Sequence, residues 1–195
     1  MRHRRAVFVV CGLAVLAAGC ASSPVHFFTL SATTPPGSAT SKLSVAVGPV
    51  SIPAAVDRSQ IVVNTSANQV SIDEFNLWAA PLQDNIARVV AENLVVLLGT
   101  PRVTLFPPAL NSDIDYRVQI EVRTFESTQG KSASLDAVWT VRRTKDGRIE
   151  TGRTSVREPI SDGSFDALAA AHSRGVAKLS QDIADAVRGL ERGTS

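Results

Sequence analysis

Two stretches of the chain carry apolar side chains at the spacing of an amphipathic helix. Over residues 82–98 the apolar positions form one broad stripe, and Gly99 and Pro101 follow it, as expected where a helix ends. Over residues 165–190 apolar side chains recur at intervals of three and four. Ser164 directly precedes that run, and serine commonly caps a helix N-terminus. The pattern therefore predicts two helices, each with one buried face.

Alternation of apolar and polar residues, which is typical of strands with one buried face, is clearest from Ile114 to Val122. The segments that have strand character are 27–30, 43–47, 61–63, 70–72, 114–122, 135–141 and 149–156. Turn-forming residues at 66–68 and 145–148 predict hairpins. The order of elements predicts an α+β domain, in which two amphipathic helices pack on one face of an antiparallel sheet of about six or seven strands.

The N-terminus has the three zones of a secretory signal. Basic residues at 2–5 precede an apolar run over 6–16 and a short stretch of small residues that ends at Cys20. The apolar run has about 11 residues, whereas a membrane-spanning helix needs roughly 20. The arrangement resembles the bacterial lipobox, with Ala17 where leucine is usual. We therefore predict that residues 1–19 are a signal peptide and that Cys20 is the lipidated first residue of the mature protein.

Removal of the signal peptide changes the charge balance. Residues 1–19 contain three arginines, so the mature chain keeps 17 basic and 18 acidic residues, a formal charge of −1. Nucleic acid is therefore not an expected partner. The predicted organisation is a lipidated tether with a short first strand and linker over 20–41, followed by a single α+β domain over 42–195. A disulfide is excluded, because Cys11 is removed with the signal peptide and Cys20 carries lipid.

The sequence offers little for catalysis. The only histidines of the mature chain are His26, close to the predicted anchor, and His172, on the apolar stripe of the last helix. We interpret His172 as a packed, hydrogen-bonded core residue rather than a catalytic base. Metal-ligand spacings and phosphate-binding loops are absent from the sequence. The prediction is a protein that is not an enzyme and has no catalytic, cofactor-binding or metal-binding residues.

Basic residues gather around the predicted turn at 145–148, among them Arg142 and Arg153. Charge on an edge strand protects a sheet from pairing with another chain, and this explanation is the simpler one. Recognition of an acidic partner or of lipid head groups is the alternative.

Several motifs occur in a fixed order along the mature chain. They are Phe27-Phe28-Thr29-Leu30, the Val-Gly-Pro-Val and Asp-Arg-x-Gln-Ile-Val elements of 47–62, Glu-Phe-x-x-Trp-Ala-x-Pro-Leu over 74–82, and Ala91-Glu92-Asn93-Leu94. With the lipobox before them, these motifs resemble the ABC-type transport auxiliary lipoproteins of the PqiC (YmbA) type. One departure is 54–56, where family members often have an aromatic residue or leucine.

The resemblance implies a non-enzymatic outer-membrane lipoprotein that faces the periplasm. Its role would be to help an MCE-domain protein of the PqiB type and an inner-membrane permease to move lipid between the membranes and so support envelope integrity. Ala21 agrees with this location, because Asp after the lipidated cysteine is the inner-membrane retention signal. Contact with phospholipid and assembly as a homo-oligomer stay open. We expect the partner interface around Asp57, Arg58, Glu74 and Trp78.

Three other functions stay open. The domain would be a lipid carrier if a cavity formed between sheet and helices, lined by residues such as Leu94, Leu98, Val118 and Trp139. It would be an envelope hydrolase if a cleft brought His172 near a serine and a carboxylate. It would be an assembly lipoprotein if its partner belonged to another outer-membrane machine.

Overall fold

The computed structural model describes residues 23–34, 41–107 and 113–193. Their elements, in chain order, are β1 His26–Phe28, β2 Val45–Ser51, β3 Gln60–Ser66, β4 Gln69–Trp78, α2 Leu82–Leu98, β5 Val103–Leu105, β6 Tyr116–Thr128, β7 Ser132–Arg143, β8 Ile149–Pro159 and α3 Phe165–Arg192. The predicted signal peptide and Cys20 lie outside the described residues. Among the residues that are described, none of the helices has the length and apolar character required to cross a membrane.

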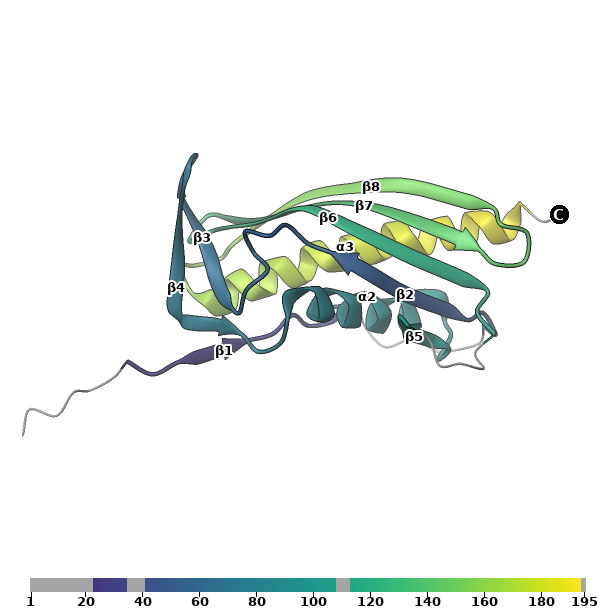
Figure 1. The fold of residues 1–195 in the computed structure, drawn as a ribbon, viewed down its shortest axis with the longest axis horizontal. Helices are drawn as coiled ribbons and strands as arrows, with labels where there is room; N and C mark the ends of the chain where they lie inside the picture. The colour runs from purple at the N-terminus through teal and green to yellow at the C-terminus, as the bar shows by residue number, and fades with distance from the viewer. Residues whose placement is uncertain (1–22, 35–40, 108–112, 194–195) are drawn as a thin grey trace, which may run out of the picture.

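The strands form two sheets, one larger than the other (Figure 1). The five-stranded sheet has the order β5-β2-β6-β7-β8, and the three-stranded sheet has the order β1-β4-β3. Both helices lie on one face of the larger sheet, with α2 against β2 and α3 against β7 and β8. The three-stranded sheet lies at one end of the long axis, and the C-terminus lies at the other. The predicted α+β class is confirmed.

The structure differs from the prediction in the number of sheets, in the relative direction of paired strands and in the number of strands. Eight strands occur in the described residues, slightly more than expected, and both sheets are mixed. β2 pairs in parallel with β5 and with β6, and β1 pairs in parallel with β4. The chain leaves β2, builds the β3–β4 hairpin and α2, and then returns beside β2 in the same direction. Alternation along a strand reports which face is buried but not the direction of the neighbouring strand.

The ends of both helices follow the predicted signals. The backbone of Gly99 adopts the left-handed conformation, with φ 61° and ψ 38°, and its N–H and that of Thr100 donate to the last carbonyls of α2. At the start of α3 the Ser164 hydroxyl accepts a hydrogen bond from the backbone N–H of Ala167, at 3.1 Å. The predicted cap at Ser164 and the predicted span of the first helix are confirmed.

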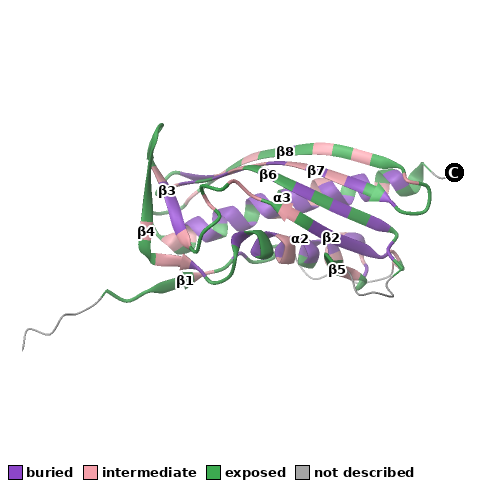
Figure 2. Ribbon diagram, viewed as in Figure 1, coloured by how far each residue is buried: buried purple, intermediate pink, exposed green. Residues whose placement is uncertain are grey.

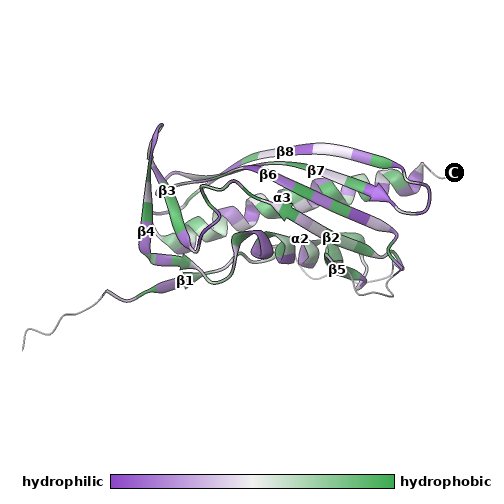
Figure 3. Cartoon of the chain, viewed as in Figure 1, coloured by the Kyte–Doolittle hydropathy of each residue, from purple (hydrophilic) through white to green (hydrophobic). Residues whose placement is uncertain are grey.

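Burial alternates along the central strand as the sequence predicts. In β6 every second residue from Tyr116 to Val122 is buried, and the residues between them are exposed. The alternating bands of burial in Figure 2 coincide with alternating hydropathy in Figure 3. The inner face of the sheet and the apolar stripes of the two helices together form one core. The outward-facing residues of β6 are polar and exposed, namely Arg117, Gln119, Glu121 and Arg123.

One close approach within the sheet depends on a residue without a side chain. Gly152 of β8 lies opposite Trp139 of β7, and a Cβ atom at Gly152 would lie 2.2 Å from the indole. The same indole donates a hydrogen bond from Nε1 to the Thr154 hydroxyl, at 3.1 Å. The ring therefore lies flat across β8 and cannot move away without losing this bond.

We expect the substitution Gly152→Ala to lower the free energy of unfolding by about 1–3 kcal/mol, because the added methyl group overpacks the Trp139 site. Gly163→Ala is the matched control, since a Cβ atom there would meet nothing within 4 Å. Urea denaturation of both variants measures the difference. If the two variants are equally stable, the Trp139 indole can shift to make room for the added methyl group, and the prediction is wrong.

Candidate docking surface and N-terminal groove

The three-stranded sheet places the predicted interface residues at the N-terminal end of the domain. β1 joins β4 in parallel, so that Phe27 lies beside Leu77 and Phe28 beside Trp78. Neighbouring residues on a strand point to opposite faces. Phe28 and Trp78 therefore face the core, whereas Phe27 faces outward and is 66% exposed.

Trp78 lies in the core and not on the surface. Only 4% of the residue is exposed. The Trp78 ring meets the rings of Phe125 and His172 edge-on, with ring centroids 6.1 and 6.3 Å apart. The rings of Phe125 and His172 are stacked on each other, with centroids 3.8 Å apart. The Trp78 backbone N–H donates to the Ser59 carbonyl at 2.7 Å. This backbone hydrogen bond ties the end of β4 to the residue that precedes β3.

The other three predicted interface residues, Asp57, Arg58 and Glu74, are exposed. Asp57 and Arg58 lie on the loop between β2 and β3, which the Trp78–Ser59 hydrogen bond ties to β4. Three charged groups at one end of the molecule are available to a partner.

A side-chain turn next to Glu74 exposes Phe75, an aromatic residue of the 74–82 motif that was not among the four predicted interface residues. The Asp73 carboxylate accepts hydrogen bonds from the backbone N–H groups of Phe75 and Asn76, at 2.9 and 2.8 Å. The regular pairing of β4 with β3 shifts over this stretch, and Phe75 is left 47% exposed. Aspartate often accepts hydrogen bonds from backbone N–H groups two or three residues later and so interrupts a strand. Asp73 in this segment is therefore a sequence signal for the irregular backbone that exposes Phe75.

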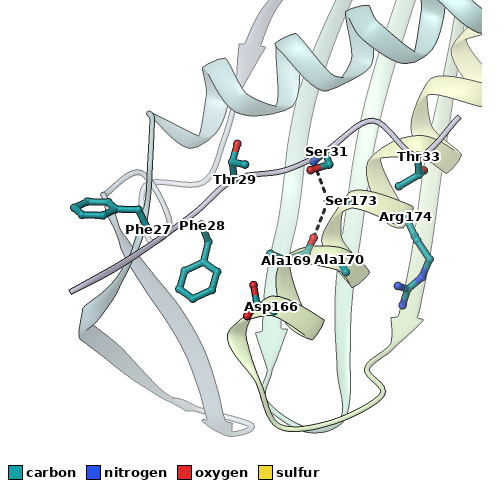
Figure 4. A pocket seen from close by; sticks show the side chains of 10 residues that line it. All are labelled: Phe27, Phe28, Thr29, Ser31, Thr33, Asp166, Ala169, Ala170, Ser173 and Arg174. Carbon is teal, nitrogen blue, oxygen red and sulfur yellow. Dashed lines mark hydrogen bonds between the residues drawn. The ribbon is translucent and has the colours of Figure 1, made fainter. Parts of the chain in front are cut away.

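A groove runs beside β1 where the chain crosses the start of α3 (Figure 4). It has a volume of about 560 Å³ and is lined by Phe27, Phe28, Thr29, Ser31, Thr33, Asp166, Ala169, Ala170, Ser173 and Arg174. Phe28 points into it and packs on Phe165, with ring centroids 5.8 Å apart, whereas Phe27 points away. The groove is not predictable from sequence patterns, because it depends on where the N-terminal segment lies in the folded chain.

The N-terminal segment is held in place by polar contacts with both helices. Arg88 of α2 donates to the carbonyl of Leu30 at 2.6 Å and to the hydroxyl of Thr29 at 3.2 Å. The N–H of Ser31 donates to the hydroxyl of Ser173 of α3 at 3.1 Å. The Leu30 side chain is buried between these contacts. The segment is therefore part of the domain.

His172 is a core residue, as predicted. Its Nε2 lies 2.9 Å from the hydroxyl of Ser127, and both residues are buried. Its Nδ1 has no hydrogen-bond partner among the described residues. A catalytic histidine needs access to substrate and a group that orients its second nitrogen. The serine–histidine contact therefore does not form a usable catalytic pair.

The four residues of the carrier hypothesis are packed in the core. Leu94 and Val118 are fully buried, and Leu98 and Trp139 are nearly so. They fill the space between sheet and helices in which a carrier would hold an acyl chain. Within the described ranges, no group of three or more His, Cys, Asp or Glu side chains is placed to hold a metal ion.

Comparison with known proteins identifies the family. Residues 28–184 match the sequence model of the ABC-type transport auxiliary lipoprotein component. The chain belongs to this family. The membership that the motifs predicted is therefore confirmed, and the family is an auxiliary component of transport. A comparison with curated proteins finds no match.

Two crystal structures share the fold of this auxiliary lipoprotein component. One, an uncharacterized protein, has 20% identity and a TM-score of 0.68 over 85% of this chain and 99% of its own. The other, a Xanthomonas campestris protein of the DUF330 family, has 18% identity and a TM-score of 0.66 over 87% of this chain and 100% of its own. At these identities the likeness establishes the fold alone.

We expect the stability of this family member to fall in mild acid because of His172. Burial lowers the pKa of His172 to about 3, from 6.5 for a free imidazole. Below pH 6.5 the unfolded chain binds a proton that the folded chain does not, so the free energy of unfolding falls by about 1.4 kcal/mol per pH unit. The stability that neutral His172 contributes is present above pH 6.5 and is lost as the pH falls toward 3.

Urea denaturation at pH 7 and pH 5 measures this loss, which should be about 2 kcal/mol. The variant His172→Gln should lack this part of the pH dependence. A wild-type protein whose stability is the same at both pH values would contradict the buried, neutral state of His172.

Proposed function

We propose that this protein is a non-enzymatic accessory subunit of an intermembrane lipid transport system. It is held at the periplasmic face of the outer membrane by lipid on Cys20, and it docks on a periplasmic MCE-domain partner. Family membership over residues 28–184 carries the proposal, because the family is an auxiliary component of ABC-type transport.

The structure supports this role through the position of the N-terminus. β1 begins at His26, six residues after Cys20. A fully extended chain spans about 3.3–3.6 Å per residue, so these residues reach at most about 22 Å. Acyl chains on Cys20 would hold the three-stranded sheet near the bilayer, and more than one chain makes anchoring stable.

We place the partner contact on the exposed charges Asp57, Arg58 and Glu74, with Trp78 supporting them from the core. Charged groups on an interface rim steer association and fix register. Phe75, half exposed beside Glu74, supplies the apolar anchor that such an interface needs.

A lipid carrier is the second candidate, and the groove beside β1 is the observation that favours it. Its volume lies in the range of small-molecule sites, and Phe28 points into it. A role as an assembly lipoprotein of another envelope machine would require a partner other than an MCE-domain protein.

The test is crosslinking in intact envelopes, followed by affinity purification of the tagged protein and mass spectrometry. We expect recovery of an MCE-domain protein, and loss of that recovery in Cys20→Ala. The triple variant Asp57→Ala, Glu74→Ala, Arg58→Ala should reduce the crosslinked partner at least fivefold. Lys145→Ala, an exposed charge at the other end of the domain, is the control.

Each alternative outcome has a distinct meaning. If phospholipid copurifies and no MCE-domain protein is recovered, the docking proposal is overturned in favour of the lipid carrier function. A partner from another machine would leave the anchor in place and overturn the lipid transport assignment. A triple variant that crosslinks as well as the Lys145 control would move the docking surface elsewhere.

A further inference from the structure

The outer face of the five-stranded sheet carries two arginines directly opposite each other. Arg117 of β6 and Arg142 of β7 are register partners in the antiparallel pair, and both are exposed. Like charges at opposed positions of a sheet repel each other. The pair lies at the end of the sheet that is remote from β1 (Figure 1).

Other arginines of this face have carboxylate partners. Arg123 pairs with Glu121 at 3.2 Å, and Arg153 pairs with Asp136 at 2.7 Å. In the part of the chain that the structure describes, no ion pair is formed by Arg117 or Arg142.

The carboxylate nearest in sequence to Arg117 belongs to Asp115, which lies just before β6. Its Oδ2 accepts hydrogen bonds from the backbone N–H and the hydroxyl of Ser44, both at 2.8 Å. Among the described residues Asp115 forms no ion pair with Arg117 or Arg142, so neither guanidinium group is held by a close carboxylate.

The arginine pair lines a hollow that also has apolar walls. The hollow has a volume of about 300 Å³, and Gln119 and Thr140 line it together with the two arginines. Phe106 and Ile149 line it as well and are 48% and 58% exposed.

Local backbone geometry fixes the position of Phe106 in the wall of this hollow. Its N–H donates to the Val47 carbonyl at 2.8 Å, which continues the pairing of β5 with β2. A Cβ atom on Gly48 would lie 3.1 Å from the Phe106 Cβ, and Gly48 has φ 114°, a conformation that favours glycine. The aromatic ring is thus held beside the two charges.

We propose that Arg117 and Arg142 form a binding site for a phosphate group, that of a phospholipid head group, with Phe106 and Ile149 contacting the apolar part of the same molecule. Guanidinium groups bind phosphate oxygens through paired N–H donors. Two exposed apolar side chains beside them match an amphiphile better than a free anion or an acidic peptide. The proposal rests on the proposed role in lipid transport and assigns a lipid contact to this protein.

The experiment is a calorimetric titration of the full-length protein anchored in phosphatidylcholine nanodiscs, with empty nanodiscs as the blank. The probes are dihexanoylphosphatidylglycerol and inorganic phosphate. We expect Arg117→Gln with Arg142→Gln to weaken binding of both probes at least tenfold. Arg123→Gln with Arg153→Gln removes two charges from the same face and is the matched control, with an expected change below twofold.

A further variant separates lipid from free phosphate. Phe106→Ser should weaken binding of the lipid probe at least threefold and leave inorganic phosphate unchanged. If only inorganic phosphate binds, or if Phe106→Ser changes neither probe, the assignment to lipid is overturned. Loss of binding in both arginine variants alike would indicate general electrostatic attraction and overturn the site.

Folding does not obscure this test, because removal of two repelling charges should leave the melting temperature equal or higher. A wild-type protein that binds neither probe would overturn the site and leave the docking proposal intact, since the titration contains no partner protein. Conversely, failure to recover an MCE-domain protein from envelopes would not change the titration.

Discussion

The contact between the apolar stripe of α3 and the inner face of the five-stranded sheet is the constraint on which the fold depends. A helix of 28 residues is about 42 Å long, so it spans the sheet from one end to the other. Apolar packing fixes how closely the helix approaches but leaves its position along the sheet poorly specified. Specific polar contacts are required to fix the position of α3 along the sheet.

Buried polar groups supply these contacts at three levels of α3. Near its start, His172 meets Ser127 of β6. Farther along, the Asn93 side chain of α2 donates to the Ser180 hydroxyl at 3.3 Å. At its end, Arg143 of β7 donates to the Leu190 carbonyl at 2.9 Å. A shift of one helical turn would break all three hydrogen bonds in a dry interior, and a buried hydrogen bond lost without replacement is costly.

Periodicity made much of this fold predictable from sequence. The span of α2, the cap at Ser164 and the hairpin between β3 and β4 followed from local signals. Burial of His172 followed from its place on an apolar stripe. These features depend on near neighbours in the chain, which sequence patterns report directly.

Other features depend on which strands meet, and the sequence pattern does not contain that information. The parallel pairings of β2 and the separation of a second sheet arise from the path of the chain. The inward direction of Trp78 depends on its register with Phe28. The opposition of Arg117 and Arg142 likewise exists only in the folded register, although each residue separately has the pattern of an ordinary exposed charge.

The parallel pairing of β1 with β4 also determines how the domain responds to force. A pull on the N-terminus acts along β1, so its three residue pairs are loaded in shear and must break together rather than one after another. Behind them, the Arg88 contact with the Leu30 carbonyl and the Ser31 contact with Ser173 carry the load into both helices. Tension at the N-terminus is therefore passed to β4 and to both helices and does not act on β1 alone.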